Sequence, residues 1–247
     1  MNPPSPVHFH GPIYCDTAHM WMGMHEPVNT ISNAAILIAA WFAYRYIKKS
    51  RVGFSGDLIL LLFLLTWVGI GSALWHGLRT MWALQLDWIP GVLYLFVLTV
   101  VWIRQAFARA WLGWLAGVLG LILMIAVSIV GIGVFGNALA QITPNLRFSP
   151  MFATVTLFGI GMVTATGRKY GRGAAIQGVL ILAAGVVAAV ARSIDLMVCD
   201  YIPFGTHFLW HIGLSTAACL GILLMVRIKK VRMGLAVVSS PSLMGRV

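Results

Sequence analysis

The sequence predicts an all-α integral membrane protein, a bundle of seven transmembrane helices with its N-terminus outside and its C-terminus in the cytoplasm. Of its 247 residues, 60% are hydrophobic and only 9% are charged, whereas soluble domains carry roughly 25% charged residues. This shortage of charge excludes a soluble enzyme, and the 10 Trp, 12 Phe and 12 Met exclude a disordered chain. The apolar stretches are continuous, unlike the ~10-residue alternating strands of a membrane barrel.

Seven apolar stretches approach the ~20 residues that a helix needs to cross a bilayer core. Loops rich in charge, proline or glycine separate them, and the fifth stretch is the shortest. The predicted spans are 28–47, 57–77, 87–104, 111–135, 150–166, 174–192 and 205–228.

These spans divide the chain into three parts. Residues 1–27 form an extracytoplasmic N-terminal segment, residues 28–228 the seven-helix membrane domain, and residues 229–247 a basic cytoplasmic tail. Residues 1–15 contain neither Lys nor Arg and no apolar run, so we expect no cleaved signal peptide.

The 17 lysines and arginines predict the orientation, because cytoplasmic loops carry an excess of these residues. With the N-terminus outside, all of them except Arg79, Arg147 and Arg192 fall on the cytoplasmic side. The net charge of +11 therefore reflects topology. The chain lacks a basic stripe or nucleic-acid recognition motif, so we expect no nucleic-acid partner. Its short loops suit a bacterial inner (cell) membrane.

The seven histidines fall into two groups. His76 lies near the outer end of the second predicted span, and His207 and His211 lie near the outer end of the seventh. These three therefore share one depth, on the extracytoplasmic side, and ionisable groups inside a membrane usually mark a functional site. The other four precede the first span: His8, His10, His19 and His25.

Helical spacing brings further polar groups to the same depth. His207 and His211 are four residues apart and share a helix face, as do Ser72 and His76, and Asp87 opens the third predicted span. Three imidazoles with a nearby carboxylate and hydroxyl match an open catalytic zinc site, which has three protein ligands and a water.

The residues alone leave other interpretations open. The histidines could mark helix ends near the lipid headgroups, or His76 could face a histidine of the last span across a haem. Asp87 could be a helix N-cap beside Pro90, and Ser72 a small residue that eases helix packing beside Gly69 and Gly71.

Three blocks of motifs in this sequence resemble the alkaline ceramidases, part of a wider superfamily of seven-span putative hydrolases that includes the adiponectin-type receptors. The resemblance covers the first three and last two spans, and the region 105–185 is generic apolar helix. The blocks read YCD at 14–16 with EPVNTISN at 26–33, GIGSALWH at 69–76 with DWIP at 87–90, and RSID at 192–195 with Cys199 and PFGTHFLWH at 203–211.

The resemblance implies that His76, His207 and His211 bind zinc, and that Asp87 and Ser72 belong to the catalytic centre. It further implies hydrolysis of the amide bond of a ceramide in the membrane, giving a sphingoid base and a fatty acid. The residue types suit that chemistry, because a bound zinc ion polarises a carbonyl and lowers the pKa of water to about 7. Asp87 would transfer protons and Ser72 would stabilise the oxyanion.

The N-terminal block carries two further expectations. Glu26, Asn29 and Asn33 form one stripe on the first predicted span, and polar groups in such a stripe commonly hydrogen-bond to neighbouring helices. In eukaryotic ceramidases the matching acidic block contributes to a calcium site, which makes Asp16 and Glu26 candidate calcium ligands. This sequence departs from that pattern, since Ile13 stands where an acidic residue is expected and the Cys15-to-Glu26 spacing is a residue shorter.

Cysteines and one acid-base pair complete the candidates. The resemblance supports a Cys15–Cys199 disulfide, which an extracytoplasmic position permits, against the alternative of two buried thiols. Cys219 is expected to pack within the last span. Arg192 and Asp195 are expected to form an ion pair, and Asp195 could instead support a zinc histidine.

Three functions follow in order of preference. The first is a zinc-dependent amide hydrolase, ceramidase-like, acting on a membrane lipid. The second is a non-catalytic seven-span zinc-containing receptor or sensor of the same superfamily. The third is a haem or transport protein that uses the buried histidines. Ser72 and Asp87 favour the first, because a structural zinc site would be closed by a fourth protein ligand.

Overall fold

The computed structural model describes residues 12–142 and 145–235, and this part of the chain is helical without a regular strand. The predicted all-α class is thereby confirmed for these residues. His8, His10 and the last residues of the basic tail lie outside the described residues. Among the described residues, six helices are long and apolar enough to cross a membrane. They are α3 (Gly56–Leu78), α4 (Met81–Gln105), α5 (Ala110–Ile142), α6 (Pro150–Tyr170), α7 (Arg172–Ile194) and α8 (His207–Arg232).

The first predicted span, 28–47, is divided at Asn33 into α1 (Pro27–Ser32) and α2 (Ala34–Lys49). Side chains at the end of α1 compete for one of its backbone carbonyls: Ser32 Oγ and Asn33 Nδ2 both donate to the Asn29 carbonyl, each at 2.8 Å. Such local bonds bend or interrupt helices. With 16 residues, α2 is shorter than the ~20 that a crossing needs, so a seventh span stays a prediction.

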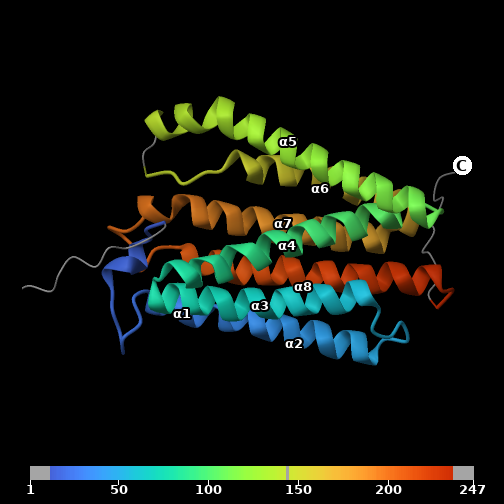
Figure 1. Ribbon diagram of the computed structural model, residues 1–247, viewed down its shortest axis with the longest axis horizontal. Coiled ribbons are helices and arrows are strands. Elements are labelled where there is room, and N and C mark those ends of the chain that lie inside the picture. Colours follow the sequence, from blue (N-terminus) through green and yellow to red (C-terminus); the bar gives the residue numbers. More distant parts are fainter. Residues whose placement is uncertain (1–11, 143–144, 236–247) are drawn as a thin grey trace, which may run out of the picture.

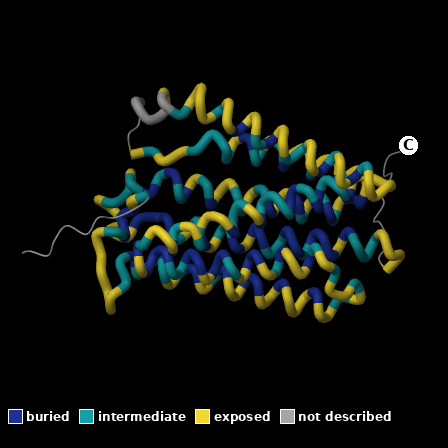
Figure 2. The backbone as a smooth tube through the Cα atoms, viewed as in Figure 1, coloured by how far each residue is buried: buried dark blue, intermediate teal, exposed yellow. Residues whose placement is uncertain are grey.

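The helices lie nearly side by side along the long axis of the molecule, with α5 and α6 at one edge and α1 and α2 at the other (Figure 1). Within the apolar windows of α3 and α8, 50% of residues are buried, against 11% in α5. Buried residues accordingly lie mostly on the inner helices, while α5 carries mostly exposed residues (Figure 2). So much exposed apolar surface requires an apolar surrounding, as the membrane prediction implies.

The structure corrects the start of the third predicted span. Helix α4 begins at Met81, with Thr80 at its N-cap position, and Asp87 lies in its second turn. The prediction that Asp87 opens the span is therefore wrong, and so is the alternative that it caps the helix. The polar residues Gln85 and Asp87 interrupt the apolar run, and Pro90 resembles a helix start, although it lies inside α4.

Pro90 also explains how closely α3 and α4 approach. Proline has no N–H to donate to the carbonyl four residues before it, so the Leu86 carbonyl makes no such helical bond. That carbonyl faces Gly71 of α3: a Cβ added to Gly71 would lie 2.5 Å from its carbon and closer still to its oxygen. Gly71 thus sets the distance between the two helices that carry Ser72, His76 and Asp87.

We expect Gly71→Ala to lower the free energy of unfolding by about 1–3 kcal/mol, because the added methyl group meets backbone that cannot rotate away. The melting temperature of the purified protein in detergent checks this. The matched control is Gly185→Ala in α7, where an added Cβ meets no atom within 4 Å. Equal melting temperatures for the two variants would contradict the proposed close contact.

Candidate metal centre

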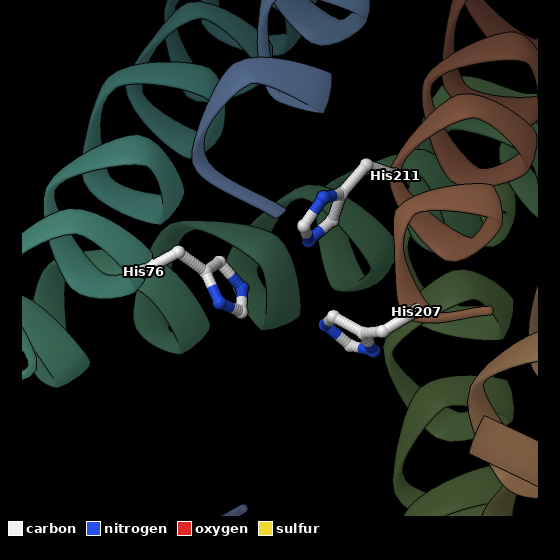
Figure 3. Close-up of side chains that lie close together, drawn as sticks. All are labelled: His76, His207 and His211. Carbon is white, nitrogen blue, oxygen red and sulfur yellow. The ribbon is translucent and has the colours of Figure 1, made fainter. Parts of the chain in front are cut away.

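Three histidines meet at one end of the bundle. His76 comes from the last turn of α3, and His207 and His211 come from the first two turns of α8 (Figure 3). Their candidate ligand nitrogens lie within 4.8 Å of one another, and each residue is at most 2% exposed. One ion could bind all three, and no fourth His, Cys, Asp or Glu of the described residues joins the group.

The start of α8 is fixed by Asp195, which lies in the 3-10 helix η2 (Asp195–Met197). One carboxylate oxygen accepts the backbone N–H groups of Thr206 and His207 at 2.7 and 2.8 Å. The other accepts the N–H of Cys15 at 2.9 Å. A carboxylate at a helix N-terminus satisfies free N–H groups and complements the helix dipole, and here it also fixes the backbone of a candidate metal ligand.

This arrangement corrects the expected Arg192–Asp195 ion pair. The Arg192 guanidinium instead lies over the rings of Phe152 and Trp210, at 5.8 and 5.6 Å from their centroids. The Asp195 carboxylate is occupied by backbone donors, so it supports His207 through the main chain and not through the imidazole.

Two histidines are oriented by hydrogen bonds from the N-terminal part of the chain. Glu26 pairs with Nδ1 of His76, and Ser32 Oγ lies 2.7 Å from Nδ1 of His211. Because Ser32 donates its own proton to the Asn29 carbonyl, it accepts the proton of His211. Both rings therefore direct Nε2 toward the cluster, the arrangement that metal-binding histidines commonly show.

The third histidine is held by stacking. The Tyr14 ring lies on the His207 ring, with centroids 3.7 Å apart and planes inclined by 23°. Burial raises the pKa of Tyr14 to about 12, so this ring stays a neutral phenol. Nδ1 of His207 has no hydrogen-bond partner among the described residues.

Ser72 and Asp87 lie beside the histidines, on the facing helices α3 and α4. The Ser72 hydroxyl, one turn before His76, lies close to the Asp87 carboxylate and interacts with it, and Asp87 also interacts electrostatically with His76. Ser72 is 2% exposed. A carboxylate and a hydroxyl thus share one edge of the cluster without joining it.

Glu26 has a role that the sequence did not reveal. Its first carboxylate oxygen accepts a hydrogen bond from Thr17 at 2.5 Å and forms an ion pair with Arg79 at 3.0 Å. Its second accepts from His76 and, at 3.2 Å, from Asn29. Burial alone would raise the pKa of Glu26, but the hydrogen bond and charge of His76, with the charge of Arg79, lower it below its ordinary value.

These contacts favour Glu26 as the orienting partner of His76. Asp16 accepts the Asn29 N–H at 2.9 Å through one oxygen, and its other oxygen has no partner among the described residues. Calcium binding by Asp16 and Glu26 stays a prediction. The sequence offered one sign of this role, an acidic residue directly before the first predicted span.

Cys15 and Cys199 form a disulfide, the pairing that the resemblance implied. Cys15 begins the 3-10 helix η1 (Cys15–Ala18) and directly follows Tyr14. The bond therefore holds the Tyr14 ring over His207 by tying its neighbour to the loop before α8. Cys219 is a free thiol within α8.

We expect Glu26→Gln to weaken metal binding at the histidine cluster by about 10–100-fold, because the amide orients His76 less firmly and removes the negative charge that favours its Nδ1 proton. Competition against a chelator of known affinity measures this constant. The control is Asp57→Asn, which breaks an ion pair of similar type with Lys229 at the opposite end of the bundle. A similar loss in both variants would mean that general destabilisation, not ligand orientation, is responsible.

Comparison with known proteins found no family model that matches the chain and no curated protein that matches its sequence.

Proposed function

We propose that this protein is a membrane-embedded zinc hydrolase that cleaves the N-acyl bond of a ceramide-type lipid. The observation that carries the proposal is the buried cluster of His76, His207 and His211, with the Ser72–Asp87 pair beside it. Three histidines leave one coordination position free for water or substrate, as in catalytic zinc sites, whereas structural sites are closed by four protein ligands.

The donor set fits zinc. Neutral imidazoles are common zinc ligands, and the hydrogen bonds to Nδ1 of His76 and His211 leave their Nε2 lone pairs available. A bound zinc ion would polarise the amide carbonyl and lower the pKa of water. Haem is less well supported, because three histidines converge on one point, whereas a haem iron takes at most two axial ligands from the protein.

Asp87 and Ser72 would divide the proton transfers and charge stabilisation. Asp87 takes a proton from the attacking water as its oxygen bonds to the amide carbon, and then delivers that proton to the nitrogen as the C–N bond breaks. Ser72 donates a hydrogen bond to the developing oxyanion. The products are a fatty acid and a free sphingoid amine, which account for every atom of lipid and water.

A cavity of about 230 Å³ next to the cluster supports access by a lipid. Tyr14 lines it and also stacks on His207, so a single ring separates this cavity from the histidines. Its wall further includes Phe148 and the two arginines Arg147 and Arg192. A lipid amide lies near the headgroup boundary, so substrate would enter sideways from one leaflet and both products would stay in it.

Substitution of Asp87 separates catalysis from metal binding. We expect Asp87→Asn to keep about one zinc per chain while turnover falls by about 10²–10⁴-fold, because the carboxylate moves protons and does not bind the ion. His76→Ala, His207→Ala and His211→Ala should each lose both zinc and turnover. Metal analysis of purified protein and ceramide hydrolysis in proteoliposomes provide the two measurements.

The same experiment distinguishes the non-catalytic receptor or sensor. That alternative predicts stoichiometric zinc in the wild type without hydrolysis of any ceramide tested. Full activity of Asp87→Asn, or full zinc occupancy in the histidine variants, would contradict the roles assigned here. Haem absorbance in the purified protein would overturn the choice of metal.

We further propose that the histidine end faces the outside of the cell membrane, as the distribution of Lys and Arg predicts. A membrane-impermeant thiol reagent applied to whole cells should label Met20→Cys and leave Lys49→Cys unlabelled until the membrane is opened. Met20 is 65% exposed in the N-terminal segment, and Lys49 ends α2. The reverse pattern would overturn the orientation, and the wild type with its one free cysteine gives the background.

A further inference from the structure

A second cavity lies at the end of the bundle opposite the histidines. Its volume is about 230 Å³, and it lies between α4 and α6, where Trp102 and Gln105 face Gly161, Ala165 and Tyr170. This is smaller than the roughly 300–1,000 Å³ of pockets that enclose whole drug-sized ligands. The cavity would therefore accept one part of a larger molecule.

An unpaired donor marks the polar end of this cavity. Gln105 is 1% exposed, and its side-chain oxygen accepts from Arg232 at 2.6 Å. Its side-chain nitrogen has no partner among the described residues, and Gln105 is one of the residues that line the cavity. Buried donors of this kind normally have a partner, so a ligand that supplies an acceptor oxygen would satisfy it.

Positive charge gathers at the same place without acidic compensation. The charged groups of Arg104 and Arg232 both interact electrostatically with the Tyr170 hydroxyl, and that of Arg232 also interacts with the Lys169 ammonium group. The chain has six acidic residues. Five belong to the histidine end, and the sixth, Asp57, is paired with Lys229 at 2.9 Å. The described residues therefore supply no carboxylate to these three cations.

The remaining wall of the cavity is apolar and open to the membrane side. Gly161 and Ala165 are exposed small residues one turn apart on α6, and a Cβ at Gly161 would meet no atom within 4 Å. From Gly161 to Tyr170 the helix rises by about 14 Å. The cavity thus has a positively charged end with a hydrogen-bond donor and continues into an apolar groove. A phospholipid has the matching arrangement, with a polar headgroup followed by apolar acyl chains.

We propose that this cavity binds an anionic phospholipid, with its phosphate at Gln105 and the basic residues and the start of one acyl chain along Gly161 and Ala165. The phosphate supplies the acceptor that Gln105 lacks and the negative charge that the protein does not provide. Basic pockets between membrane helices bind acidic lipid headgroups by this chemistry.

The test measures lipid retention by the full chain in nanodiscs. Phosphatidylglycerol should bind at least 10-fold more tightly than phosphatidylcholine, as measured by native mass spectrometry after release from the disc. Gly161→Leu fills the groove and should weaken binding of phosphatidylglycerol at least 10-fold. Gly185→Leu, which adds the same side chain at another open glycine, should leave it unchanged.

Two variants that each remove one positive charge test the polar end of the cavity. Arg232→Gln should weaken binding about fivefold, the loss expected for about 1 kcal/mol per basic residue. Lys48→Gln, at the same end of the bundle but on α2, should have no effect. Circular dichroism and melting temperature in neutral lipid establish that each variant is folded, and Ala165→Leu replaces Gly161→Leu if the latter does not fold.

Two outcomes would overturn the proposal. Equal weakening by both glutamine variants, without an effect of the groove-filling variant, would show diffuse surface attraction. Displacement of phosphatidylglycerol by millimolar inorganic phosphate, or an equal rise in melting temperature with phosphate alone, would show that the site binds a free anion and not a lipid.

Discussion

The buried Glu26 carboxylate is the interaction on which the candidate site depends. An ionised group taken out of water is costly unless it is paired and hydrogen-bonded. Glu26 meets this condition through an ion pair with Arg79 and through hydrogen bonds with Thr17, Asn29 and His76. These partners come from two stretches that are distant in the sequence, residues 17–29 and residues 76–79. The same carboxylate that orients a candidate metal ligand therefore joins the N-terminal segment to the end of α3.

Arg79 completes this junction from the other side. It ends α3 in the left-handed region, at φ 55°, which favours glycine and is uncommon for other residues. The ion pair with Glu26, a bond from its side chain to the Pro12 carbonyl at 2.7 Å and the Trp75 ring below it hold the residue there. This local strain makes possible the tight turn from α3 into α4, which places Asp87 next to Ser72.

Hydropathy and periodicity predicted most of the fold, because a bilayer tolerates few alternatives to long apolar helices. The i, i+4 spacing of His207 and His211 predicted their shared face, and His76 was predicted at the same depth. The start of α4 was missed, because Asp87 and Pro90 resemble a helix boundary. Glu26 and Ser32 as partners of the histidines could not be found by spacing, since hydrogen bonds between distant segments leave no periodic pattern.

The contact between Cys15 and Asp195 constrains the order in which the cell can complete this site. These residues are 180 positions apart and joined by a hydrogen bond from backbone to carboxylate. At a synthesis rate of about 5–20 residues per second, Asp195 follows Cys15 from the ribosome after roughly 10–40 s. During that interval Tyr14 cannot yet stack on His207, and the first helices enter the membrane before the three histidines can meet. The candidate metal centre can therefore be completed only near the end of biosynthesis, because a chain that stops before His207 carries only one of the three clustered histidines, His76.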